Sequence, residues 1–254
     1  RISDADPVLA AAQSLSVESD PSWLLRDNAV AALGDLETQS SVNALARVLR
    51  RRDSAPDARK EAARVLGRRS DAATLRVLRD GIEDSDAGVR HEVIRSVATV
   101  GRRLGERGLT SARTEASGLL NKVLLQGEAK DEIPARAGLL LLGDESQRAP
   151  LVTALKSPED DKRLKVVQSV ERDAAIFATA LDDKGAPVRR LAARKLAAMG
   201  DSRALPVLRE TIAAQRDTTE GLHAYAQLRR LGQDFSPPPD AQAMLENKDP
   251  QVRA

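Results

Sequence analysis

The chain has 254 residues, of which 40 are Lys or Arg and 38 are Asp or Glu, so its net charge of +2 predicts no general attraction to nucleic acid or to an anionic membrane. It contains no cysteine, which excludes disulfides, thiolate metal sites and cysteine nucleophiles. No apolar run approaches the ~20 residues that span a bilayer, and the first residues lack the layout of a signal peptide. We expect a soluble protein, with the cytoplasm favoured over the periplasm and the compartment otherwise open.

One phrase recurs along the chain: an apolar residue, an arginine, small apolar residues, and then Leu-Gly or a close variant. Clear copies begin at Leu25-Arg26, Ala58-Arg59, Val89-Arg90 and Val188-Arg189, and Val252-Arg253 opens another. Looser copies begin at Ala135-Arg136, around Lys162-Arg163 and at Leu222-His223. The step is 33 residues from Arg26 to Arg59 and 31 from Arg59 to Arg90, which fits one helix pair per repeat.

Within each clear copy, the apolar residues fall on one side of a helix. Counted from the arginine, positions −1, +3, +4 and +7 are apolar, as in Val89, Val93, Ile94 and Val97. The intervening segments 42–49, 72–82, 116–124 and 204–212 have the same period. Aspartates precede several helices as caps, and glycines are predicted to end them in the left-handed conformation, at Gly34, Gly67, Gly101, Gly143, Gly200 and Gly232.

These features predict an all-α protein, a right-handed α-α superhelix built as a solenoid of antiparallel helix pairs. A single pair cannot bury its apolar stripe, so neighbouring pairs must stack. We expect one solenoid domain over residues 1–254 with about seven repeats. The predicted repeat boundaries lie near residues 20, 53, 84, 126, 157, 182, 214 and 249. The segment 249–254 reads as the opening of another repeat, so we expect the chain to be a piece of a longer protein.

The phrases Asp86-Ala87-Gly88-Val89-Arg90 and Gly200-Asp201-Ser202-Arg203-Ala204-Leu205-Pro206-Val207-Leu208 resemble HEAT repeats, specifically the short type named after phycobilisome lyases. The resemblance covers roughly residues 20–254 and implies a HEAT-type solenoid in which the Val-Arg helix is the inner one of each pair. It also implies a structural ladder of arginines paired with turn aspartates, with His223 as a weakened rung. That ladder would consist of Arg26, Arg59, Arg90, Arg136, Arg189 and Arg253. The family serves many roles, so the resemblance says little about function.

Positions +1 and +5 of the inner helices lie one turn apart and face away from the apolar stripe. They predict two basic patches on the concave face, made of Lys60, Arg64, Arg68, His91 and Arg95 in one case and of Arg190 and Arg194 in the other. Ala137 and Leu141 leave an apolar gap between the patches. A groove of this kind suits an acidic, amphipathic protein segment, although the same residues could simply be a solvated helix face.

A second candidate is the segment 101–111, because 46 residues separate Arg90 from Arg136. We interpret the extra length as an insertion loop, with Arg102, Arg103 and Arg107 as its basic residues. Insertions in solenoids map to loops that often bind a partner, and equally often they are tolerated variation in length.

Catalytic constellations are missing from the sequence. His91-Glu92 resembles one His-Glu motif of deoxyhypusine hydroxylase, a HEAT protein with a di-iron centre, but that family uses several such motifs and this chain has one. HEAT-like DNA glycosylases also present a basic face, yet they need aromatic side chains, and this chain has only Trp23, Phe177, Tyr225 and Phe235. A bilin lyase subunit is suggested only by the name of the repeat type.

The sequence therefore predicts a bacterial protein-protein interaction scaffold that binds a partner on the concave face of the solenoid. We expect no enzymatic activity, no cofactor, no metal, no small-molecule substrate and no membrane insertion. The alternative is a nucleic-acid-binding HEAT solenoid, similar to a DNA glycosylase but without catalysis.

Overall fold

The computed structural model describes residues 30, 33, 38–52, 55–69, 71–127, 129–215 and 218–233. These residues are helical or lie in turns, and no strand occurs among them. The all-α class expected from the sequence is confirmed, with helices that pack pairwise in chain order. Within the described ranges, no helix is long and apolar enough to cross a membrane.

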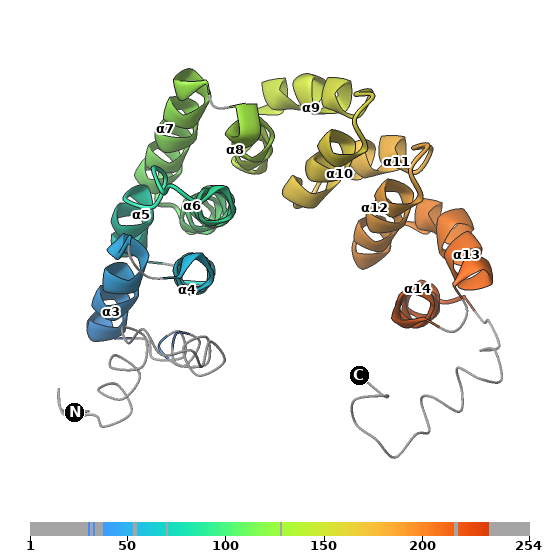
Figure 1. Ribbon diagram of the computed structural model, residues 1–254, viewed down its shortest axis with the longest axis horizontal. Coiled ribbons are helices and arrows are strands. Elements are labelled where there is room, and N and C mark those ends of the chain that lie inside the picture. The colour runs from blue at the N-terminus through green and yellow to red at the C-terminus, as the bar shows by residue number, and fades with distance from the viewer. Residues whose placement is uncertain are drawn as a thin grey trace, which may run out of the picture. The chain divides into compact units, whose positions relative to one another are not determined.

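The chain forms two compact units, residues 1–148 and 149–254. In unit 1 the described helices are α3 (Gln39–Arg50), α4 (Pro56–Leu66), α5 (Ala72–Arg79), α6 (Ala87–Glu106), α7 (Thr110–Gln126) and α8 (Ala129–Leu141). Figure 1 shows α3, α5 and α7 in one layer of this unit and α4, α6 and α8 in the other. Helix α6 packs against α4, α5, α7 and α8, so it is the centre of the unit.

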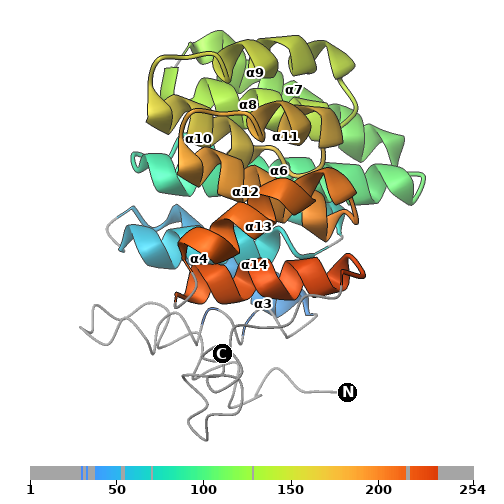
Figure 2. The same cartoon turned by 90° about the vertical axis from the view of Figure 1, so that its right-hand side faces the viewer.

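Unit 2 repeats this arrangement. Its helices are α9 (Arg148–Ala154), α10 (Asp160–Ser169), α11 (Ala174–Ala180), α12 (Ala186–Ala198), α13 (Leu205–Ala214) and α14 (Thr219–Arg230), as seen in Figure 2. Short 3-10 turns at Glu145–Gln147 and Ser202–Ala204 precede α9 and α13. Helix α12 contacts α10 and α14 in its own layer and α11 and α13 in the other.

The apolar stripes form the core, as the period of the sequence predicts. In α4, Ala58, Ala62, Ala63 and Leu66 are buried, and the equivalent residues of α6 and α12 are buried too. Small side chains dominate these stripes, which lets helices approach closely. The cap at Asp86 is confirmed, because its carboxylate accepts a hydrogen bond from the amide of Val89 at 2.9 Å.

Two glycines do not end helices in the predicted way. Gly67 has a right-handed φ of −62° rather than a left-handed one, and Gly101 lies inside α6. A Cβ on Gly67 would lie 2.3 Å from Ser96 Oγ, and one on Gly101 would lie 2.4 Å from the Cβ of Ala116. Both positions require glycine because another helix crosses there, whereas Gly143 and Gly200 have the positive φ that was expected.

The continuation of α6 through Gly101 also corrects the prediction of an insertion loop at 101–111. The extra residues lengthen α6 to 20 residues and α7 to 17 residues. Leu104 is buried, so the apolar stripe of α6 simply extends for another turn. The connection between the two helices is the short turn around Gly108, whose φ is +90°.

Candidate functional site

Arg-Asp ion pairs connect neighbouring helix pairs inside each unit. The pairs are Arg59 with Asp84 at 2.8 Å, Arg90 with Asp131 at 2.7 Å and Arg163 with Asp183 at 2.8 Å. A further donor of each guanidinium binds a backbone carbonyl of the turn before its own helix, as Arg90 Nη1 does with the carbonyl oxygen of Asp84 at 2.8 Å. These arginines hold the scaffold together and are not available to a ligand.

The ladder differs from the expected one at several rungs. Arg163, which was not among the expected rungs, forms a buried one, while Arg136 pairs with Glu132 at 2.9 Å in its own helix. Arg189 pairs with Glu210 at 2.7 Å. The expected rungs Arg26 and Arg253 lie outside the described residues.

The first predicted basic patch, on α4 and α6, carries its own compensating carboxylates. Arg64 donates to Glu61 at 2.6 Å, and Arg95 donates to Glu92 at 2.5 Å. The hydrogen bond that Arg64 donates to Glu61 raises the pKa of Arg64, and the nearby Glu92 raises it further. A glutamate one turn before each arginine therefore neutralises this surface, while Lys60 and Arg68 remain exposed.

His91 is part of the scaffold as well. Its Nε2 lies 2.9 Å from Asp131 Oδ1 and 3.0 Å from the carbonyl oxygen of Lys130. Both neighbours are acceptors, so this ring nitrogen carries the proton. Glu92 binds Arg95 instead of sharing a site with His91. Among the described residues, no group of three or more His, Cys, Asp or Glu side chains could hold a metal ion.

The remaining positions singled out in unit 1 also have structural roles. Arg103 donates to the carbonyl oxygen of Arg68 at 2.9 Å and so completes the end of α4, and Arg102 pairs with Glu106 at 2.5 Å. Arg107 is exposed and forms the C-cap of α6. In the predicted apolar gap on α8, Ala137 is buried and Leu141 is half-buried.

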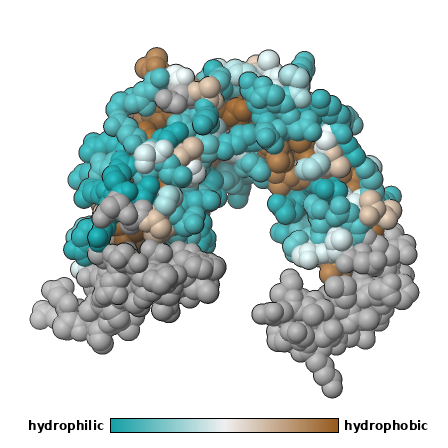
Figure 3. Space-filling model, in the orientation of Figure 1, coloured by the Kyte–Doolittle hydropathy of each residue, from teal (hydrophilic) through white to brown (hydrophobic). Residues whose placement is uncertain are grey.

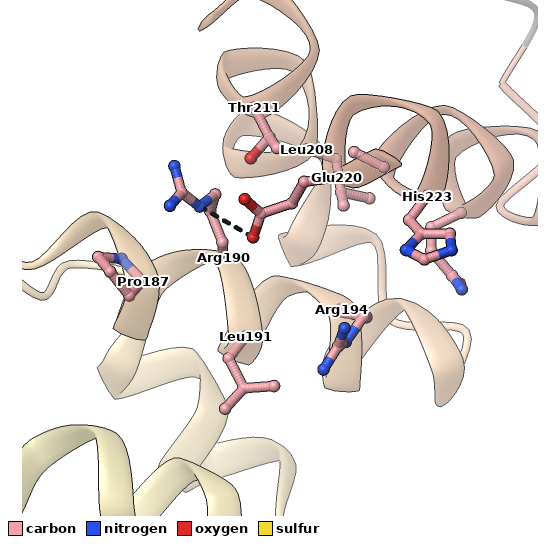
Figure 4. Close-up of a pocket in the computed structure, with 10 residues that line it drawn as sticks. Pro187, Arg190, Leu191, Arg194, Leu208, Thr211, Glu220 and His223 are labelled. Carbon is pink, nitrogen blue, oxygen red and sulfur yellow. Dashed lines mark ion pairs between the residues drawn. The ribbon is translucent and has the colours of Figure 1, made fainter. Parts of the chain in front are cut away.

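The second predicted patch, on α12 in unit 2, lies in a pocket. Arg190 and Arg194 line it together with residues of α13 and α14, as Figure 4 shows. The other lining residues are Pro187, Leu191, Leu208, Thr211, Glu220, His223, Ala224 and Gln227. The cavity measures about 110 Å³, whereas a single water needs roughly 10–15 Å³. The structure thus places two of the predicted cations beside apolar walls.

Two buried polar atoms in this pocket make no hydrogen bond, although one of them, Arg190 Nε, is ion-paired with Glu220. Arg190 Nε and Gln227 Oε1 are buried and form no hydrogen bond with other described residues. Arg194 is exposed, and it forms no ion pair with the described part of the chain. Buried polar groups are nearly always satisfied in folded proteins, so a donor and an acceptor unsatisfied in one cavity suggest a site for a ligand.

Sequence reasoning missed the α14 side of this pocket because it placed the last repeat in the wrong register. With His223 as the rung, the stripe would fall on Ala226 and Arg230, which are exposed. The buried residues are instead Ala224, Tyr225 and Leu228. His223 is therefore an exposed residue of the pocket and not a rung. The true stripe could have been found by fitting these three residues to the +3, +4 and +7 pattern.

Apart from the pocket, apolar surface is limited. Figure 3 shows mostly hydrophilic residues on the visible face of each unit. The large hydrophobic side chains that are exposed among the described residues are Leu109, Leu125 and Met199. The pocket of α12, α13 and α14, which two of the predicted cations line, is therefore the candidate site.

Comparison with known families agrees with the fold. Residues 12–98 match the family model for HEAT repeats, and residues 188–213 match the model for the PBS lyase HEAT-like repeat. The chain therefore contains HEAT repeats in both units. The second match covers most of α12 and α13, so two helices of the candidate pocket belong to one recognised HEAT repeat.

No curated protein matches the sequence. Two solved structures are similar over nearly the whole HEAT-repeat chain. Human deoxyhypusine hydroxylase is 16% identical with a TM-score of 0.48, over 97% of this chain and 92% of its own. YibA of Escherichia coli is 19% identical with a TM-score of 0.46, over 100% of this chain and 95% of its own.

The first of these structures corrects the expectation that the chain is not an enzyme. Deoxyhypusine hydroxylase is an enzyme by name, so the expectation of no enzymatic activity does not stand. At 16% identity, the likeness assigns neither an activity nor a substrate to the HEAT-repeat chain.

Proposed function

We propose that this HEAT-repeat protein is a scaffold that binds an acidic, amphipathic polypeptide segment, and that the pocket of α12, α13 and α14 holds that segment. The observation that carries the proposal is that two buried atoms of one cavity, Arg190 Nε and Gln227 Oε1, make no hydrogen bond, although Arg190 Nε is ion-paired with Glu220. One is a donor and the other an acceptor. A polypeptide supplies both complements, because its carbonyl or carboxylate oxygens accept and its backbone amides donate.

The acidic character of the segment follows from the charges around the cavity. Among the described residues that line the cavity, the guanidinium groups of Arg190 and Arg194 face one carboxylate, that of Glu220. An incoming carboxylate on Arg194 would form a charge-assisted hydrogen bond without displacing a partner in the described chain. A cation would meet two guanidinium groups, so a metal or a basic peptide fits poorly.

The apolar part of the segment follows from the walls. Leu191 is half-buried, and Leu208 and Ala224 close the cavity from α13 and α14. An aliphatic side chain seated there would lose water on most of its surface, and such burial contributes about 25 cal/mol per Å². Acidic and aliphatic groups must therefore lie close together in the bound segment.

Selection from a random-peptide library displayed on phage tests the proposal, with the complete chain immobilised. We expect enriched peptides that carry Asp or Glu beside Leu, Ile or Val. Arg194→Glu should lower their affinity about tenfold or more, because it creates like-charge repulsion at the site. Leu191→Asp should also weaken binding, whereas Leu222→Asp, a half-buried leucine of α14 outside the pocket, is the matched control.

The proposal would be refuted if the enriched peptides lacked acidic residues, or if Arg194→Glu left the affinity of the enriched peptides unchanged. Circular dichroism of each variant checks that the helices are intact.

The nucleic-acid alternative is less favoured, because Arg64 and Arg95 are already paired with glutamates. Binding to duplex DNA at two salt concentrations decides it, since phosphate contacts would give a steep dependence on salt.

A further inference from the structure

One side of the pocket is already occupied by a carboxylate of the chain itself. Glu220 Oε1 lies 3.2 Å from Arg190 Nε, as the dashed line in Figure 4 marks. Gln215 bridges the two residues: in the amide orientation that satisfies both, its nitrogen donates to Glu220 Oε2 at 2.9 Å and its oxygen accepts from Arg190 Nη1 at 3.1 Å. Glu220 thus stands where the acidic group of a ligand would bind.

The contact between Arg190 and Glu220 is incomplete. Although the ion pair is close, the buried Nε of Arg190 makes no hydrogen bond with it or with other described residues. Glu220 is about half-exposed, with 49% of its side chain accessible, so it can turn into solvent without unfolding α14. A well-aligned carboxylate could make the parallel hydrogen bonds to Arg190 that Glu220 does not make.

Arg190 and Arg194 are one turn apart on the same face of α12. We propose that Glu220 competes with the ligand for Arg190 and Arg194, and that a carboxylate attached to an aliphatic group displaces Glu220. This inference rests on the proposed function for the nature of the partner. Glu220 thereby sets the affinity of the pocket and its preference among anions. Two carboxylates close to one guanidinium repel each other, so the incoming group must exchange with Glu220 rather than join it.

The same geometry selects against phosphate. A phosphate group at neutral pH carries nearly two negative charges and meets both the repulsion of Glu220 and the apolar surfaces of Leu191 and Leu208. A carboxylate carries one charge, and its aliphatic part gains from the same apolar surfaces. The preferred ligand group is therefore an aliphatic carboxylate, from an acidic side chain with an apolar neighbour or from the end of a chain.

The test compares the complete wild-type chain with Glu220→Gln, which removes the competing charge and keeps the size of the side chain. Glu210→Gln is the matched control, since Glu210 pairs with Arg189 in the same unit but does not line the pocket. The probes are 4-methylpentanoate, its neutral amide 4-methylpentanamide, and inorganic phosphate. Binding is followed by chemical-shift changes of the amides of Leu191 and Leu208.

We expect Glu220→Gln to bind 4-methylpentanoate up to about fivefold more tightly than the wild type, which matches the strength of a partly exposed ion pair. Glu210→Gln should bind like the wild type, and Arg194→Gln should bind weakly in either background. The neutral amide and phosphate should bind worse than the carboxylate to the wild type.

Equal affinity of the wild type and Glu220→Gln, or equal binding of the acid and its amide, would overturn the inference. The peptides from the library selection separate this inference from the proposed function. If peptides bind but Glu220→Gln does not change their affinity, the competition by Glu220 is refuted and the scaffold function stands. If the carboxylate binds as expected and no peptide is enriched, the inference stands and the polypeptide function falls.

Discussion

Arg59 of α4 and Asp84, in the turn before α6, form a two-bond ion pair that is closed to solvent. Arg59 Nε donates to Asp84 Oδ2 at 2.8 Å and Nη2 donates to Oδ1 at 2.9 Å, with 3% and 0% of the two side chains exposed. The pair connects the α3–α4 pair of helices to the next pair along unit 1. Arg90 with Asp131 and Arg163 with Asp183 repeat the contact elsewhere.

Asp84→Asn should destabilise unit 1 by about 3–5 kcal/mol, because it leaves the Arg59 charge buried without a counter-charge. Asp80→Asn is the control, since Asp80 pairs with the more exposed Arg50 and its loss should cost under about 1 kcal/mol. Hydrogen exchange of the α4 and α6 amides measures the effect in this unit. Similar protection in the two variants would contradict the structural role of the buried pair.

The buried Arg-Asp pairs should also make the free energy of unfolding depend on pH in the acidic range. Burial alone would raise the pKa of Asp84, but hydrogen bonds from Arg59 and from the Asp86 amide outweigh it and lower the pKa below the ordinary 3.8. The pKa of Asp183 is lowered in the same way by Arg163. Because the folded pKa is depressed, this stabilisation is complete above pH 3.8 and is lost as the pH falls through the folded value. Urea unfolding at a series of pH values should show the decline, and Asp84→Asn should reduce its slope.

Two helical glycines should respond to alanine in opposite directions. Gly101→Ala places a Cβ 2.4 Å from Ala116 in the core, and the overpacking costs about 1–3 kcal/mol, more than the helix propensity of alanine returns. A Cβ on Gly118 of α7 would point into open space, with no neighbouring atom within 4 Å, so Gly118→Ala should stabilise by up to ~1 kcal/mol. Thermal unfolding of both variants distinguishes the steric effect of a helix crossing from the effect of helix propensity.

The cations predicted from the sequence should not contribute equally to binding of the selected peptides. Arg194→Glu should lower affinity about tenfold and weaken its dependence on salt. Arg64→Glu and Arg95→Glu should change affinity little, because Glu61 and Glu92 already neutralise those side chains. Titration of each variant with one peptide measures the difference. A large loss in Arg64→Glu would mean that the α4–α6 face also contacts the partner.

The helix stripes could be read from the sequence because burial follows a local period. Val89, Val93, Ile94 and Val97 repeat at helical spacing and are all buried. The weaker last copy was misplaced, since Leu222 and Leu231 resemble the pattern while Ala224, Tyr225 and Leu228 form the buried stripe. Few apolar residues separate two such registers, so the pattern discriminates weakly between them, and packing against α12 and α13 fixes the observed one.

The candidate site was harder to predict, because it too depends on how different helices pack. Positions +1 and +5 correctly identified Arg190 and Arg194 as facing away from the core, but the rule says nothing about which acids lie opposite. Glu61 and Glu92 neutralise their neighbours within one helix, a relationship that the i,i+3 spacing contains. Glu220 comes from a different helix and reaches Arg190 only after α12 and α14 pack together.

By itself, the sequence determined that this chain folds into stacked helix pairs, because the period of apolar residues, the small side chains and the arginine of each repeat act locally. The tertiary structure alone decided that Gly67 and Gly101 are crossing points, that the segment 101–111 extends two helices, and that one pair of cations borders a cavity. Those outcomes depend on distances between residues of different helices, and the periodic pattern along one helix carries no information about them.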